Sequence, residues 1–222
     1  MSLPILYSLR NCPYAMRARM AIYKSQQTVI LRDLVLSNKP KAFLEASPKA
    51  TVPVVVLPNN EVIDESFDVM IWALSTRDPD NLLQENEASN KITRSKSEML
   101  DLIKQFDDGF KPALEAYKCA KRYHESNLME CRHECEEYIK DLEERLNTHT
   151  YLLDNKESMA DIALLPFIRQ FAKVERSWYL QSPYPKLKQW LNAYLQSLMF
   201  SKVMAKHPLY KEGDEPIKFG SV

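Results

Sequence analysis

Cys12 is the first residue of this sequence whose chemistry stands out. It follows a short apolar run at 3–8 and precedes Pro13, and proline is favoured at the first position of a helix because its missing N–H would be unsatisfied there. A helix start offers free N–H groups and a partial positive charge, which both stabilise an anion. We therefore expect Cys12 to be a nucleophilic thiolate of lowered pKa, helped by Arg17 and Arg19 if they face it. The alternative is a packed free cysteine.

The other cysteines carry less chemistry. Position 15 is Ala, so a two-cysteine C-x-x-C mechanism is excluded. Cys131 and Cys135 share a helical face, whereas His133 between them points elsewhere. A structural zinc site needs four ligands, and the sequence does not supply four, so we expect no metal. Cys119 is interpreted as helix packing.

Two later positions are suited to holding a peptide ligand. Val52-Pro53 begins a β-branched run. A cis bond there would turn the Val52 backbone outward to pair with an extended peptide, while an ordinary trans proline at a strand start is the alternative. Ser66 is a good helix N-cap whose following N–H groups suit a carboxylate, and Glu65 suits an amine. A plain cap beside a surface acid is the competing interpretation.

The elements around these residues must bring them together. Apolar and β-branched runs predict strands at 3–8, 28–34, 52–57 and 61–64. Helices are predicted from Pro13, over Lys39–Ala46 and over 66–76. The order β-α-β-α-β-β-α fits a mixed sheet with helices on its faces.

The second half of the chain has a different pattern of polar and apolar residues. Residues 78–87 are polar and contain Asp78-Pro79-Asp80, which indicates a linker. Apolar residues then recur at helical spacing, and we expect helices at about 88–125, 128–147, 158–174 and 184–204. The division is therefore an α/β domain over residues 1–77, a linker over 78–87 and an all-helical domain over 88–222.

Composition excludes several classes of protein. The formal net charge of the 222 residues is +0, without the basic excess of a nucleic-acid binder. The three glycines lie too far apart for a phosphate-binding loop. No apolar run reaches the roughly 18 residues of a membrane helix, and the start lacks the features of a secretory signal. We expect no membrane partner and a cytoplasmic location.

With these features in place, the chain resembles the cytosolic glutathione transferases, and among them the omega class and its bacterial relatives. The resemblance is weak over 78–157, which matches only in helical character. Elsewhere it follows the family's order in CPYAMRARMAI (12–22), LSNKP (36–40), SPKATVPVVVL (47–57), IDES (63–66), SMADIALLPF (158–167) and YPKLKQWLNAYL (184–195). It implies a thioredoxin-like first domain followed by a helical bundle.

The resemblance also implies roles. Cys12 would form a mixed disulfide with glutathione, the co-substrate, and Ser158 with Asp161 would form a structural capping box on a helix that Pro166 bends. The glutathione-binding residues would be Tyr14 beside the cysteine, Lys39 at the glycyl carboxylate, Val52 and Pro53 at the cysteinyl part, and Glu65 and Ser66 at the γ-glutamyl end.

This sequence departs from the family pattern in places. Ala50-Thr51 stands before Val52 where relatives often carry Gly and a hydrophobe, and Tyr14 replaces a common Phe. Tyr7 ends the first strand, as the catalytic residue of tyrosine-type transferases does, although the sequence around Cys12 favours the cysteine type. Tyr123 and Trp178 are candidates for a second-substrate pocket, with bundle packing or a partner surface as the alternative.

The expected function is therefore a glutathione-dependent thiol transferase acting on a small electrophile or a disulfide, with no metal. A second glutathione would resolve the Cys12 mixed disulfide. Two alternatives stay open: a non-catalytic binding or regulatory protein of the same fold, and isomerase chemistry like that of zeta relatives, which carry Ser in place of Cys12. The family implies a homodimer.

Overall fold

The computed structural model describes residues 2–85 and 89–220, with side chains omitted for 89–95. Contacts divide the chain into two compact units. The first comprises Met1–Asp80 together with Ser197–Val222, and the second comprises Asn81–Gln196. Among the described residues, no helix has the length and hydrophobicity that crossing a bilayer requires.

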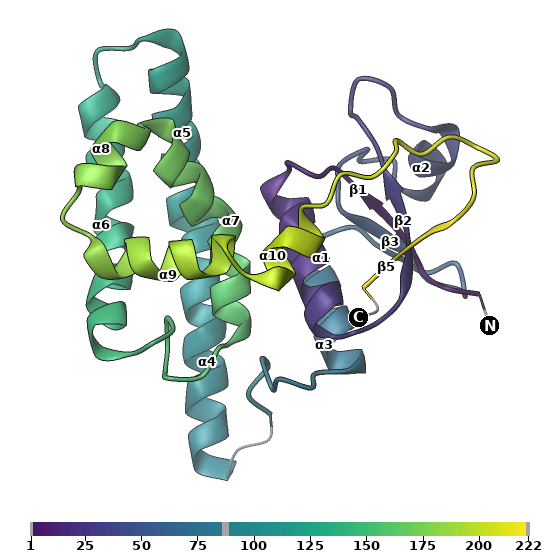
Figure 1. The fold of residues 1–222 in the computed structure, drawn as a ribbon, viewed down its shortest axis with the longest axis horizontal. Helices are drawn as coiled ribbons and strands as arrows, with labels where there is room; N and C mark the ends of the chain where they lie inside the picture. Colours follow the sequence, from purple (N-terminus) through teal and green to yellow (C-terminus); the bar gives the residue numbers. More distant parts are fainter. Residues whose placement is uncertain (1, 86–88, 221–222) are drawn as a thin grey trace. The chain divides into compact units, whose positions relative to one another are not determined.

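A mixed sheet forms the centre of the first unit (Figure 1). Its spatial order is β4-β3-β1-β2-β5. β1 pairs in parallel with β2 and antiparallel with β3, so Tyr7 lies between Arg32 and Val54. The strands are β1 (Ile5–Ser8), β2 (Val29–Asp33), β3 (Val54–Val56), β4 (Val62–Ile63) and β5 (Ile217–Phe219).

Three helices cover this sheet and complete the predicted β-α-β-α-β-β-α order. Figure 1 shows α1 (Pro13–Lys24) and α3 (Ser66–Thr76) on one side of the sheet and α2 (Lys41–Ala46) on the other. Phe43 of α2 packs on Tyr7 of β1, with ring centroids 5.3 Å apart. The mixed sheet with helices, and the helical unit that follows it, confirm the expected fold class.

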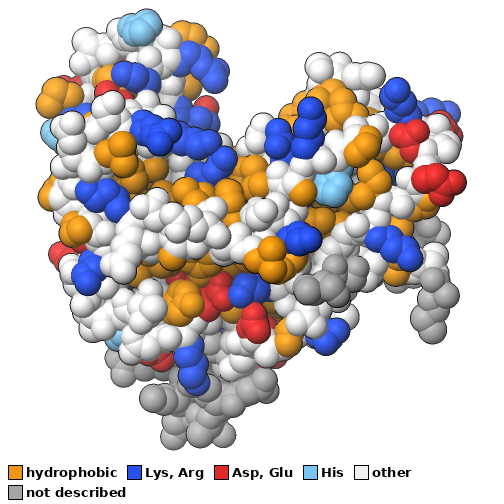
Figure 2. Space-filling model, in the orientation of Figure 1, with side chains coloured by type: hydrophobic (Ala, Val, Ile, Leu, Met, Phe, Trp, Pro, Cys, Tyr) orange, Lys and Arg blue, Asp and Glu red, His pale blue; other side chains and the backbone are white. Residues whose placement is uncertain are grey.

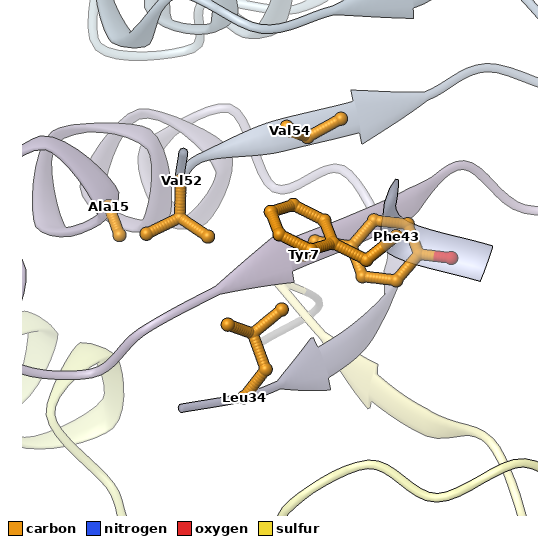
Figure 3. Packing of buried hydrophobic residues seen from close by; sticks show 6 residues of the cluster. All are labelled: Tyr7, Ala15, Leu34, Phe43, Val52 and Val54. Atoms are coloured by element: carbon orange, nitrogen blue, oxygen red, sulfur yellow. The ribbon is translucent and has the colours of Figure 1, made fainter. Parts of the chain in front are cut away.

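One hydrophobic cluster holds the start of α1 against the strand ends. Figure 3 shows its side chains, with Ala15 of α1 beside Val52 and with Tyr7 beside Phe43. Cys12 packs against the cluster and is partly buried. The cluster consists of Tyr7, Ala15, Leu34, Phe43, Val52 and Val54. Burial of these apolar groups therefore fixes the position of Cys12 relative to the chain at 52–54.

The end of the chain belongs to the first unit, which corrects the expected boundary. We expected an all-helical domain over 88–222, but α10 (Leu198–Val203) packs on α1 and β5 pairs with β2. Arg19 donates to the Val203 carbonyl at 3.2 Å. The physical reason is that β2 would otherwise end the sheet with unpaired backbone groups. A three-residue strand is too short for its periodicity to be recognised.

The second unit is all-helical over its described residues. Its helices are α4 (Ser89–Gln105), the π-helix η1 (Phe106–Phe110), α5 (Lys111–Tyr123), α6 (Leu128–Thr148), α7 (Met159–Val174), α8 (Arg176–Gln181) and α9 (Pro185–Leu195). The sequence did not predict α8. The helix expected over 184–204 stops after α9, because Ser197 caps a new helix by accepting the Phe200 N–H at 3.1 Å.

The long helix expected over 88–125 contains the π-helical turn η1. A Cβ on Gly109 would lie 2.1 Å from the Tyr138 hydroxyl, so only glycine lets that ring approach so closely. The Tyr138 ring in turn packs edge-on against Phe106 and Phe110. This close packing accompanies the local departure from α-helical geometry, as inserted turns of this kind often do.

The capping box at the start of α7 is confirmed. Ser158 donates its backbone N–H and its hydroxyl to Asp161 Oδ2, at 3.0 and 2.9 Å. Asp161 Oδ1 accepts from the Leu152 N–H and the Trp190 indole N–H. Burial raises the pKa of Asp161 to about 6, although these four donors act in the opposite direction. The carboxylate therefore joins three segments of the second unit.

Candidate functional site

Cys12 lies immediately before α1, as the sequence predicted. It is the N-cap residue, with φ −74° and ψ 126°, and Pro13 follows as the first helical residue. Its half-buried thiol donates to the Val52 carbonyl with a sulfur–oxygen distance of 3.9 Å. The backbone N–H groups of Tyr14 and Ala15, in the first turn of α1, favour the thiolate form of the sulfur. Two of the expected site residues, Cys12 and Val52, are thus brought together.

The pKa of the Cys12 thiol differs from the lowered value that the sequence led us to expect. Burial raises the pKa of the thiol above its ordinary value, and the nearby Ala15 and Tyr14 N–H groups only partly oppose this. A thiolate in an apolar surrounding loses hydration that two amide donors do not fully replace. The predicted lowering of the pKa by the helix start is therefore wrong.

Arg19, one of the two arginines of α1, does not supply the expected positive potential. Both are fully buried. The Arg19 guanidinium pairs with Asp33 at 2.7 Å and also donates to the Ser8 hydroxyl. Because the charge of Arg19 is neutralised by Asp33, it contributes little field at Cys12. The sequence could not reveal this, since Arg19 has the helical spacing of a site residue but a partner on β2.

The Val52–Pro53 bond is cis, which answers a question that the sequence left open. Val52 is buried in the cluster of Figure 3, and its carbonyl is the acceptor of the Cys12 thiol. Pro53 leads directly into β3. The Cys12 thiol and the backbone at the beginning of β3 therefore lie side by side.

The beginning of α3 differs from expectation by one residue. Glu65 is the N-cap residue and Ser66 the first helical residue, without a side-chain cap bond. Ser66 is buried, whereas Glu65 is exposed and pairs with Lys49 at 2.9 Å. Lys49 also pairs with Asp64 at 3.1 Å. The predicted acid-and-serine pair is present, with a cation beside it that the sequence analysis did not find.

Lys39 and Tyr14 lie at the surface near these elements. Lys39 is half-buried just after the bridge between Val35 and Asn38, and it pairs with no carboxylate of the described residues. The Tyr14 side chain is 39% exposed on the first turn of α1. Both side chains are therefore accessible to a ligand of the first unit.

Tyr7 is unsuited to the tyrosine-type role considered above. Its ring is 2% exposed, and its hydroxyl accepts from Arg32 Nη1 at 2.6 Å. Burial raises the pKa of Tyr7, although Arg32 opposes that effect. These contacts give Tyr7 a packing role in the first unit.

The second-substrate candidates are separated within the second unit. Tyr123 is 65% exposed at the end of α5. Trp178 of α8 lies under the Arg132 guanidinium, 4.4 Å from its ring centroid, and edge-on to Phe171. Within the part of the chain that the structure describes, the rings of Tyr123 and Trp178 make no contact with each other. The contacts of Trp178 favour the packing interpretation, and a pocket lined by both residues stays a prediction.

A group of cations lies near these residues. Figure 2 shows several Lys and Arg side chains where α5 and α8 lie in the second unit. Burial lowers the pKa of Lys173, and the positive charges of Arg169 and Arg176 lower it further. The Lys173 ammonium therefore lies close to two other positive charges.

The other cysteines form no metal-binding cluster within the described chain. Cys131 and Cys135 are buried, while the His133 side chain is 63% exposed beside Glu136. Burial raises the pKa of Cys135 to about 12. The described residues contain no group of three or more metal-binding side chains.

Comparison with known proteins accounts for this combination of elements. The model of the glutathione S-transferase N-terminal domain matches residues 6–81, and that of the C-terminal domain matches residues 106–197. The chain belongs to the glutathione transferase family. A curated relative of this transferase is glutathione S-transferase omega-1 of Mus musculus. The two are 27% identical over 93% of this chain and 82% of the mouse protein.

Solved structures share the fold of this transferase. Glutathione transferase Omega 3C from Trametes versicolor has a TM-score of 0.76, with 16% identity over 95% of this chain and 93% of its own. A Phanerochaete chrysosporium glutathione transferase, solved in complex with oxidized glutathione, also has a TM-score of 0.76. It shows 19% identity over 91% of this chain and 94% of its own. At these identities the likeness shows the architecture alone.

Sequence reasoning missed Lys49 and Asp64, which lie beside the candidate site residue Glu65. No local pattern links Lys49 to Glu65, which lies sixteen residues later. Only the return of the chain through β3 and β4 brings the two side chains together. The one available signal was the basic residue within SPKATVP (47–53), a segment already singled out for its departure from the family pattern.

Proposed function

We propose that this chain is a glutathione-dependent thiol transferase in which Cys12 exchanges disulfides with glutathione. The observation that carries the proposal is the half-buried Cys12 sulfur at the start of α1, beside the Val52 carbonyl, in a member of the glutathione transferase family. Ala15 occupies the place of a second cysteine, so the cycle uses one thiol of the protein.

The residues around Cys12 support a tripeptide bound alongside it. The backbone of Val52 and Pro53 would pair with the cysteinyl part of glutathione, as an added strand does. Lys39, whose ammonium pairs with no described carboxylate, would take the glycyl carboxylate. Glu65 and Ser66, where α3 begins, would hold the γ-glutamyl end, and Tyr14 would lie beside the reacting sulfur.

The proposed exchange has two steps. The Cys12 thiolate attacks the glutathionyl sulfur of a mixed disulfide; the S–S bond breaks, the other thiol leaves with a proton, and Cys12 is joined to glutathione. A second glutathione thiolate then attacks the glutathione sulfur of that adduct, which releases oxidised glutathione and restores Cys12. The sum of the two steps converts one mixed disulfide and one glutathione into one free thiol and one oxidised glutathione, so atoms and electrons balance.

The raised pKa of Cys12 shapes this chemistry. Only the thiolate attacks, so burial lowers the reactive fraction at neutral pH. A thiolate of higher pKa is intrinsically more nucleophilic, which offsets part of that loss. A docked glutathione would also change the surroundings of the sulfur. The proposal therefore expects slow exchange near neutral pH that accelerates as the pH rises.

Mass spectrometry tests the proposal directly. Incubation with oxidised glutathione should add one glutathionyl group to the peptide containing Cys12, and added reduced glutathione should remove it. Cys12→Ala should abolish this adduct. Cys119→Ala is the matched control, because that half-buried cysteine lies in the second unit. Adducts on other cysteines, with Cys12 unmodified, would refute the proposal.

A second candidate is a non-catalytic glutathione-binding protein. The observation that favours it is the raised pKa of Cys12, since a passive cysteine needs no activation. The two candidates differ in turnover of a small disulfide such as 2-hydroxyethyl disulfide with glutathione. A thiol transferase loses turnover with Cys12→Ser. A binding protein shows no turnover above background, and its affinity for glutathione survives the substitution.

The second substrate is proposed only as a class: a small electrophile or a disulfide. A homodimer, which the family implies, and a cytoplasmic location, which the sequence analysis led us to expect, complete the proposal. The four free cysteines of the structure are compatible with a reducing compartment.

A further inference from the structure

We propose that Lys49 binds the α-carboxylate of the γ-glutamyl residue of glutathione. Lys49 and the neighbouring acids would then recognise both charges of that amino-acid head group. This inference rests on the proposed function and deepens it, because it assigns a specificity-determining residue to the same site.

The charges at the beginning of α3 are arranged in alternation. The Lys49 ammonium lies 2.9 Å from Glu65 Oε1 and 3.1 Å from Asp64 Oδ1. All three side chains are accessible, with exposed fractions of 54% for Lys49, 64% for Glu65 and 28% for Asp64. A ligand can therefore approach both signs of charge without any side chain leaving a buried position.

The head group of a γ-glutamyl peptide complements this arrangement. It carries one ammonium and one carboxylate on the same carbon atom. Its ammonium would lie between Glu65 and Asp64, and its carboxylate would pair with Lys49 and with the N–H groups where α3 begins. Each charge of the ligand then meets an opposite charge, whereas a site made of Glu65 and Ser66 alone offers no cation to the carboxylate.

The loop that carries Lys49 is held in place by the site itself. The Ala50 N–H donates to the Ser47 carbonyl at 2.9 Å, and the Ser47 hydroxyl donates to Asp64 at 3.3 Å. Ser47 is only 1% exposed. These bonds tie the loop to the chain just before α3, so Lys49 stays near Glu65.

The same loop also leads to the reacting cysteine. Lys49 precedes Val52 by three residues, so their Cα atoms are at most about 10 Å apart. The Val52 carbonyl accepts from the Cys12 thiol. One short segment therefore carries the proposed carboxylate-binding cation and the backbone proposed to hold the cysteinyl part of the same tripeptide.

Lys49 could also act in the opposite way, as a competitor of the ligand ammonium. The two roles predict opposite changes in affinity when Lys49 is removed. Because Lys49 pairs with Glu65, it would compete with the ligand ammonium for that carboxylate if it made no contact of its own with the ligand. Removal of a competitor tightens binding, whereas removal of a carboxylate-binding group weakens it.

Calorimetry of glutathione binding to the full chain separates these roles. Lys49→Ala should weaken glutathione binding about fivefold, the upper range for an exposed ion pair. It should leave the affinity for 4-aminobutyryl-Cys-Gly unchanged, because that analogue lacks the α-carboxylate. Lys41→Ala is the matched control: Lys41 is an exposed lysine of the same unit that pairs with Glu45 on α2, and its loss should change neither affinity.

The remaining outcomes overturn one idea or the other. Equal weakening toward both ligands would give Lys49 a merely structural role, and unchanged or tighter glutathione binding would also refute the inference. Wild-type chain that binds neither ligand would refute the proposed function itself. If Lys49→Ala does not fold, Lys49→Met replaces it in the same measurement. The wild-type chain gives an independent check, because it must bind glutathione more tightly than the analogue.

Discussion

At the scale of single residues, two opposing effects set the pKa of Cys12: the loss of hydration on burial and the nearby backbone N–H donors. The helix start provides the Tyr14 and Ala15 N–H groups, which favour the thiolate, but contact with the hydrophobic cluster removes water from the sulfur. Desolvation is the larger effect, so position at a helix start does not suffice to activate a cysteine. Activation would require groups that the ligand brings or that replace the lost water.

The first prediction concerns the pH dependence of Cys12. Because burial raises its pKa, its rate of alkylation by iodoacetamide should still be rising at pH about 8.5, the ordinary cysteine pKa. Quantifying the labelled Cys12 peptide against pH measures this. A rate that levels off below neutral pH would mean that the helix start outweighs burial. Repetition with bound S-methylglutathione would show whether the ligand lowers the pKa.

At the scale of elements, both units depend on how a helix begins. In the first unit the starts of α1 and α3 present N–H groups at the site. In the second unit the start of α7 is closed by Asp161, whose two oxygens accept four hydrogen bonds. A helix start left open serves a ligand, whereas a closed one serves stability.

The second prediction is that Asp161→Asn destabilises the protein by about 3 kcal/mol, because a buried amide can accept at only one of its two ends. Its NH₂ group would face donors that the carboxylate now satisfies. Urea denaturation measures the change. Asp108→Asn, which alters an exposed ion pair with Lys104, should change stability by less than about 0.5 kcal/mol. Similar stabilities for the two variants would contradict the structural role of Asp161.

At the scale of the whole molecule, the end of the chain completes the unit that its beginning forms. β5 pairs with β2, Phe219 is buried, and the Tyr210 N–H donates to the Asp33 carbonyl at 2.8 Å. Arg32 also lies over the Tyr210 ring, 4.3 Å from its centroid. The first unit is therefore assembled from both ends of the sequence.

The third prediction follows from that arrangement. Truncation after Met204 removes β5 and leaves the backbone of β2 unpaired at the sheet edge, which favours pairing with other chains. We expect a lower unfolding temperature by circular dichroism and increased light scattering on heating. Phe219→Ala should lower the unfolding temperature while keeping the edge paired, so its scattering should stay near that of the full chain. A truncated protein that matches the full chain in both measurements would contradict the prediction.

The sequence by itself determined the order of elements over residues 1–77 and the helical character of the second unit. Alternation and β-branched runs located the strands, and Pro13 located the start of α1, because these signals act over a few residues. They also identified Cys12, Val52-Pro53 and Glu65-Ser66 as the positions that could bind a peptide thiol. Features that depend on neighbouring residues in the chain can therefore be predicted from the sequence.

Tertiary structure decided what depends on distant neighbours. The pKa of Cys12 follows from the cluster packed against it, and the charge of Arg19 is cancelled by Asp33 on another element. Lys49 meets Glu65 only after the chain folds back, and β5 exists because β2 offers an unpaired edge. Desolvation, ion pairing and strand pairing act through space, so the spacing of residues along the chain does not reveal them.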